Sequence, residues 1–202
     1  MSFFGKRKDS QPLLFLMEPF SSLTLVTGSF KRISSLPAGI DCEEWMAAHT
    51  VDFVNFTQLF YSSISEYCDP VGVMGAGGVD YQWKNADASP AQYCDSALAW
   101  MQAQVNDESL FPTRQGISLN EGQAFPKEFI VVVRAIFKQL VRILSYIYYE
   151  HYERILHLSS EAHLNTLFAH LICFAMHFEL MERKELEPMR QLIQAYEQAG
   201  RI

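Results

Sequence analysis

The chain has 202 residues, of which 49% are hydrophobic and 13% aromatic, so it can bury a sizeable core and is not a wholly disordered chain. Its formal net charge of -7 argues against nonspecific nucleic-acid binding and fits a basic protein partner. No apolar run approaches the ~20 residues that a membrane helix needs, and the four cysteines lack the spacing of a disulfide framework. We therefore expect a protein of the cytoplasm without membrane insertion.

Residues 1–35 differ from the rest of the chain. The basic residues 6–8 precede the apolar residues 12–17, an order that imitates a secretory signal. The apolar run is short, however, and Pro19 soon interrupts it. We expect a partly ordered N-terminal arm over residues 1–35, followed by one helical domain over residues 36–202.

The first long helix is expected to follow the break at Pro37 and Gly39. Asp41 can cap its first amides, and Glu43 and Glu44 place anions at the positive end of the helix dipole. Apolar residues then recur in two adjacent rows, Met46, Phe53, Phe60 and Tyr67, and His49, Phe56 and Ile64. This spacing predicts one buried face about six turns long.

The middle of the chain is less regular. Glycines and prolines punctuate residues 69–90, which predicts a loop, and alternation over residues 79–83 predicts a short strand or a small β-hairpin within it. A helix is expected from Tyr93 to near Asn106. Residues 107–125 are expected to be mostly loop.

The strongest helical periodicity follows Pro126 and predicts a central core helix. Its apolar residues fall at three- and four-residue steps: Phe129, Val132, Val133, Ile136, Phe137, Leu140, Ile143, Leu144, Ile147 and His151. A third long helix should follow a cap at residues 159–160, and a last helix should cover residues 184–199 with Pro188 in its first turn. The elements predict a mostly α, single-domain helical bundle with one small β element.

Three cations share one face of the central helix. Arg134, Lys138 and Arg142 lie four residues apart and form a row that could bind a phosphate through charge-assisted hydrogen bonds. The same spacing is common on solvated helix faces, so an ordinary surface stripe is the competing interpretation.

The first long helix also carries a second, acidic and aromatic face. Trp45 and Asp52 are seven residues apart, on a side about 100° from the row that contains Met46 and Phe53, and Glu44 precedes them. Such a face is a candidate partner surface. Alternatively, Trp45 belongs to the core, and the two carboxylates serve the helix dipole or solubility.

Three segments carry a family resemblance: residues 43–53 (EEWMAAHTVDF), 107–112 (DESLFP) and 161–170 (EAHLNTLFAH). In this order and spacing the chain resembles the Mob/phocein family of kinase co-activators. The resemblance implies a helical Mob fold and a non-catalytic co-activator or adaptor. It also implies binding to the N-terminal regulatory region of an NDR/LATS-class AGC kinase, in cytokinesis, mitotic exit or growth control. The same resemblance implies the nucleus, the spindle pole or the division site as locations besides the cytoplasm.

The resemblance implies specific roles for the two surfaces. It assigns kinase contact to Glu44, Trp45, Asp52 and His170, while a further acidic position of the family is Ile40 here. It also implies that the basic cluster binds phosphothreonine motifs of an upstream kinase or scaffold. Two members of that cluster match Lys138 and Arg142, but a third position, usually arginine, is Gln139 here, which reduces fork-shaped donation.

The resemblance further implies a zinc site, of which this chain keeps half. Cys68 matches the first cysteine of the family pattern and His151 the second histidine, but Val73 and Tyr146 stand at the other two positions. Structural zinc requires four ligands, so we expect no zinc and no other cofactor. Other side chains could ligate, although no spacing singles them out: Cys94, Asp69, His157 and Asp80.

Two other functional classes stay open. The first is a phocein-like scaffold in trafficking or phosphatase assemblies without kinase activation, which the changes at Ile40 and Gln139 favour. The second is a metal-dependent enzyme, but no nucleophile with a nearby base is identifiable. The retained acidic and aromatic residues of the first long helix favour the co-activator.

Overall fold

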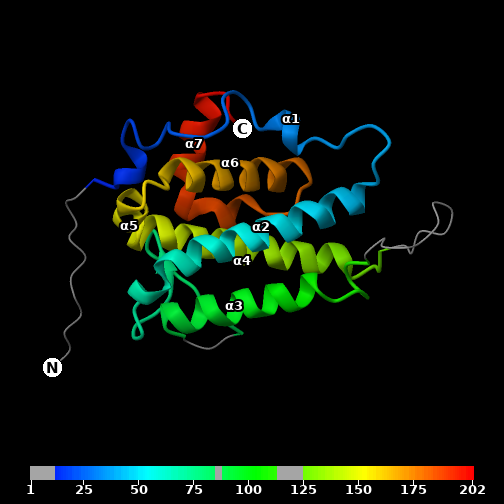
Figure 1. Ribbon diagram of the computed structural model, residues 1–202, viewed down its shortest axis with the longest axis horizontal. Helices are drawn as coiled ribbons and strands as arrows, with labels where there is room; N and C mark the ends of the chain where they lie inside the picture. The colour runs from blue at the N-terminus through cyan, green and yellow to red at the C-terminus, as the bar shows by residue number, and fades with distance from the viewer. Residues whose placement is uncertain (1–11, 85–87, 113–124) are drawn as a thin grey trace.

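The computed structural model describes residues 12–84, 88–112 and 125–202. The predicted mostly α fold is confirmed: four long helices, α2 (Cys42–Ile64), α3 (Pro90–Val105), α4 (Phe129–Glu150) and α6 (Glu161–His177), lie side by side with nearly parallel axes (Figure 1). Helix α4 contacts α2, α3 and α6. From Leu140 to Tyr148, every residue of α4 except Arg142 is buried, so this helix is the centre of the core.

Helix α2 begins where the sequence predicts. The Asp41 carboxylate accepts hydrogen bonds from the amides of Glu43 and Glu44 at 2.9 and 3.1 Å. Its buried face differs from the predicted rows because it includes two threonines, and it consists of Met46, Thr50, Phe53, Val54, Thr57, Tyr61 and Ile64. The prediction that Phe56 and Tyr67 are core residues was wrong, since both are exposed.

The small β element and α3 follow the predicted pattern. Strands β1 (Gly75–Ala76) and β2 (Val79–Asp80) pair antiparallel, so a small β-hairpin in this loop is confirmed, but it covers residues 75–80 rather than 79–83. Helix α3 starts with a capping box in which Ser89 and Gln92 exchange hydrogen bonds of 3.2 and 3.3 Å. Residues 113–124 of the predicted loop lie outside the described residues.

The C-terminal region contains two departures from the prediction. A short helix, α5 (Tyr152–His157), lies between α4 and α6 and buries Tyr152 and Ile155, and the Ser160 hydroxyl makes no cap to α6. The predicted last helix is divided into the 3-10 helix η3 (Arg183–Met189) and α7 (Arg190–Gln198). Pro188 lies in η3, and α7 begins two residues after it.

The described part of the N-terminal arm packs against the domain. Phe15, in the 3-10 helix η1 (Leu14–Leu16), is buried against the rings of Tyr148, Tyr149 and Tyr152 at centroid distances of 5.2–5.8 Å. Phe30 is also buried, directly before the one-turn helix α1 (Lys31–Ser34). Residues 1–11 lie outside the described part of the chain.

One buried amide holds this segment in place. The Asn165 Nδ2 donates to the carbonyls of Phe20 and Leu23 at 2.7 and 2.8 Å, and its Oδ1 accepts from the Tyr148 hydroxyl at 2.8 Å. Asn165 is fully buried on α6, so it links the arm, the central helix and α6.

Among the described residues, no helix combines the length and apolar character that a membrane crossing requires.

Replacing Asn165 with alanine should lower the free energy of unfolding by about 2–4 kcal/mol, because it leaves two carbonyls and the Tyr148 hydroxyl without their partner. Urea denaturation measures this loss. The matched control is Asn55→Ala on the exposed side of α2, which should change stability by less than about 0.5 kcal/mol. Equal effects of the two substitutions would contradict the role given to Asn165.

Candidate partner-binding groove

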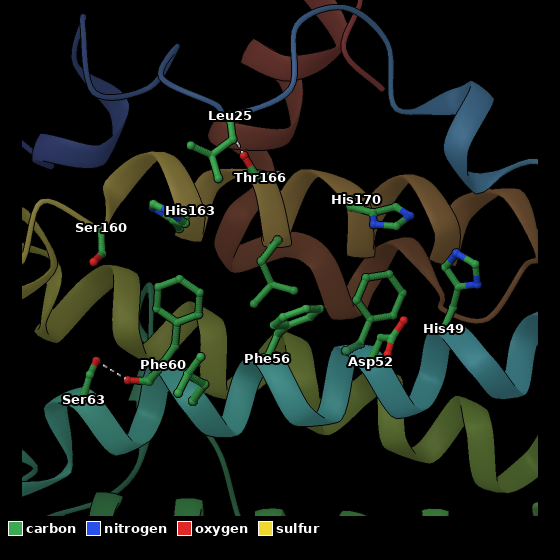
Figure 2. Close-up of a pocket in the computed structure, with 13 residues that line it drawn as sticks. Leu25, His49, Asp52, Phe56, Phe60, Ser63, Ser160, His163, Thr166 and His170 are labelled. Atoms are coloured by element: carbon green, nitrogen blue, oxygen red, sulfur yellow. Dashed lines mark hydrogen bonds between the residues drawn. The ribbon is translucent and has the colours of Figure 1, made fainter.

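A groove with a volume of about 490 Å³ runs between α2 and α6. Side chains from the two helices face each other across it, and the N-terminal arm contributes Leu25, whose amide donates to the Thr166 hydroxyl at 2.8 Å (Figure 2). Its lining consists of Leu25, His49, Asp52, Phe53, Phe56, Leu59, Phe60, Ser63, Ser160, His163, Thr166, Leu167 and His170. We call this cavity the α2–α6 groove.

The α2 side of the groove is apolar and open to solvent. Phe56 and Leu59 are 52% and 66% exposed, respectively, and Phe60 is half-buried beside them. Exposed side chains of this size, gathered in one concave region, are typical of a surface that a partner covers. We call Phe56, Leu59 and Phe60 the apolar floor of the groove. The sequence predicted Phe56 for the core and gave no role to Leu59, so it missed the exposed part of this floor.

Two histidines line one end of the α2–α6 groove. The ring centroids of His49 and His170 are 5.5 Å apart. Burial, with a smaller contribution from His49, lowers the pKa of His170 to about 4. Burial also lowers the pKa of His49, against the opposing effects of the Trp45 carbonyl and Asp52. Both rings are therefore neutral at pH 7, and His170 Nε2 has no hydrogen-bond partner among the described residues.

Asp52 supplies the charge of this surface. It is exposed, and it is the one acidic or basic residue, apart from histidines, in the described lining of the groove. A carboxylate at the edge of an apolar floor attracts a cationic side chain on the ligand and orients it. The α2–α6 groove therefore suits an amphipathic segment with apolar anchors and a basic residue.

The four residues predicted for kinase contact have different positions. Asp52 and His170 line the α2–α6 groove. Trp45 adjoins it through His49, with ring centroids 4.1 Å apart, but Trp45 is half-buried and its Nε1 donates to the Ser34 carbonyl at 3.3 Å. Glu44 is half-buried and is not part of the groove lining. The structure thus brings two predicted residues together, places Trp45 next to them and leaves Glu44 at the start of the helix.

The three cations of the basic row on α4 differ in exposure and in their partners. Arg134 is exposed, whereas Lys138 Nζ lies 2.8 Å from Glu185 Oε1 in an ion pair. Arg142 is half-buried, and its Nη1 donates to the Tyr93 hydroxyl at 3.1 Å. The sequence placed the three cations on one face, but it could not reveal a carboxylate that reaches them from η3.

The residues at the predicted zinc position form a hydrogen-bonded cluster without a full ligand set. Cys68 Sγ lies 3.7 Å from His151 Nε2, which is hydrogen-bonded to the Tyr146 hydroxyl at 2.9 Å. Val73 is 45% exposed and has no ligating atom. Burial raises the pKa of the Cys68 thiol and lowers that of His151, so both are neutral at pH 7.

These residues do not fit structural zinc. In the described part of the chain, no group of three or more histidine, cysteine, aspartate and glutamate side chains could hold a metal ion. The tyrosine hydroxyl instead satisfies the histidine nitrogen that a metal would use.

Comparison with known proteins gives consistent matches. The model of the Mob1/phocein family matches residues 22–189, a range that begins within the predicted arm. The "CBK1 kinase activator protein MOB2" of Saccharomyces cerevisiae is 41% identical over 98% of this chain and 70% of its own length. The protein of the same name from Candida albicans is 40% identical over 96% of this chain. The "Maintenance of ploidy protein mob2" of Schizosaccharomyces pombe is 37% identical over 94% of this chain and 78% of its own length.

The relatives extend beyond the matched region to different degrees. The match spans 63% of the Candida albicans protein, so more than a third of that protein has no counterpart in the alignment.

We propose that the protein folds without zinc. Metal analysis by inductively coupled plasma mass spectrometry after mild purification should find far less than about one zinc per chain, because two ligands cannot complete a tetrahedral site. The thermal unfolding midpoint should be the same with and without a chelator. Stoichiometric zinc, or a midpoint that falls when the chelator is added, would overturn this proposal.

Proposed function

This chain belongs to the Mob1/phocein family, and we propose that it is a non-catalytic co-activator of an NDR/LATS-class protein kinase. The kinase's basic N-terminal regulatory region would bind in the α2–α6 groove. The proposal includes a place in cytokinesis, mitotic exit or growth control, and a cytoplasmic or division-site location.

The observation that carries this proposal is the open apolar floor of the groove beside a single carboxylate. Leu59 and Phe56 offer exposed apolar surface, and Asp52 lies among the lining residues. Burying such surface under a partner helix yields ~25 cal/mol per Å² of apolar area, while the carboxylate selects a basic ligand. The net charge of -7 adds a general attraction for a cationic partner.

The names of the relatives support a kinase as this partner. Two proteins about 40% identical to this chain are named as activators of the CBK1 kinase. These names favour co-activation over a scaffold without kinase activation.

The proposed mechanism is a shift of conformational populations. A kinase whose N-terminal region has active and inactive arrangements moves toward the one that the groove binds more tightly. Binding can shift the equilibrium between the two arrangements at most by the ratio of their affinities for the groove, and this shift needs no catalytic group on this chain.

A second contact in the proposal is a phosphothreonine motif from an upstream kinase or scaffold. Arg134 and Lys138 line a cavity of about 410 Å³ on the α4 surface, and Arg142 follows one turn later. A phosphate can accept charge-assisted hydrogen bonds from such cations. A phosphothreonine peptide that binds no more tightly than its unphosphorylated form would exclude this contact.

Leu59→Asp should weaken binding of an NDR/LATS-class N-terminal peptide at least about tenfold, because it puts a charge on the floor of the groove. The matched control is Val131→Asp on α4: Val131 is 63% exposed, close to the 66% of Leu59, but lies outside the groove lining. Isothermal titration calorimetry measures both affinities.

Asp52→Lys should slow association with the same peptide and remove much of its salt dependence, because it reverses the charge that attracts a basic ligand. Glu197→Lys on the exposed side of α7 makes the same change in net charge away from the groove lining. If Leu59→Asp and Asp52→Lys both fold and bind like their controls, the groove is not the kinase site.

A further inference from the structure

Two cations of the basic row, Lys138 and Arg142, already face an anion supplied by the chain. Glu185, on η3, points its carboxylate between two side chains of α4. Its Oε1 is 2.8 Å from Lys138 Nζ, and its Oε2 is 4.0 Å from Arg142 Nη2. Each carboxylate oxygen therefore faces one cation, which is the arrangement that a bound phosphate would also adopt.

Arg142 is fixed in this position by aromatic neighbours. Its guanidinium carbon lies 5.0 Å from the centre of the Tyr81 ring, and its Nη1 donates to the Tyr93 hydroxyl. That hydroxyl in turn donates to Gln139 Oε1 at 2.6 Å. A ligand that uses Arg142 must therefore come to the place where Glu185 lies, since the arginine is not free to swing outward.

The cavity beside this ion pair is rich in carboxylates. Its lining contains two basic residues, Arg134 and Lys138, and three acidic residues, Glu179, Glu182 and Glu185. A ligand carboxylate carries no more charge than Glu185, which the chain itself holds nearby, so it gains nothing over Glu185 by the exchange. A phosphate has a charge of about -1.5 to -2 and three acceptor oxygens, so it can compete where a carboxylate cannot.

We propose that Glu185 is a specificity-determining residue of the anion site: it occupies the position between Lys138 and Arg142, and only a phosphate displaces it. This inference rests on the phosphopeptide contact of the proposed function. Ligands with aspartate or glutamate in place of phosphothreonine are rejected, and the affinity for phosphothreonine is held down by the exchange with Glu185.

The test uses three short peptides with phosphothreonine, threonine or glutamate at the same central position, and the full chain as wild type, Glu185→Gln and Glu187→Gln. Fluorescence anisotropy gives each affinity. Glu187 is the matched control, because it lies on the same 3-10 helix and pairs with Arg190 at 3.3 Å, outside the cavity lining. Glu185→Ala is a second variant, which excludes the amide of glutamine as a replacement ligand for Lys138.

The wild type and Glu187→Gln should bind the phosphothreonine peptide and neither of the other two. Glu185→Gln and Glu185→Ala should bind the phosphothreonine peptide about tenfold more tightly or better, and should gain binding of the glutamate peptide. Unchanged or weaker phosphopeptide binding by both variants overturns the role of Glu185 and leaves the phosphopeptide contact standing. If no protein distinguishes the phosphothreonine from the threonine peptide, the contact itself is wrong, and the inference falls with it.

Discussion

The packing of Phe53 is the interaction on which the α2–α6 groove depends. Its ring centroid lies 5.7 Å from that of Phe137 on α4. The ring centroids of Phe174 and His170 on α6 lie at 5.7 Å and 5.0 Å, respectively. These contacts hold α2 and α6 against each other and against the buried central helix α4. At 100° per residue, Phe56 and Leu59 are turned about 60° and 120° from Phe53, so they cannot join this cluster and remain at the surface. A helix with more apolar residues than its core face accommodates thus leaves apolar side chains exposed in the groove.

In two other clusters, groups that could bind a ligand already have partners within the chain. The Tyr146 hydroxyl hydrogen-bonds His151 at the position where the family resemblance implies zinc. Glu185 pairs with Lys138 at the position where the resemblance implies phosphate. The α2–α6 groove differs from both, because its exposed apolar residues have no covering segment among the described residues. This contrast explains why the groove, rather than the metal position or the basic row, carries the proposed function.

The sequence predicted features that depend on neighbours along the chain. The cap at Asp41 and the periodicity of α4 are local, and both were confirmed. The exposure of Phe56 was missed because a row of apolar residues does not indicate how wide a face the core can cover. The contact of Lys138 with Glu185 was missed because 47 residues separate them, and no local pattern encodes such a pairing.

The central claim is that a kinase peptide binds in the α2–α6 groove, and methyl NMR of the full chain tests it most directly. Titration with the N-terminal regulatory peptide of an NDR/LATS-class kinase should shift the methyl signals of Leu25, Leu59 and Leu167, which line the groove. The methyls of Val71 and Val131, which are exposed elsewhere, should stay unchanged. Saturable shifts at Val71 or Val131, with the three groove leucines unaffected, would contradict the account.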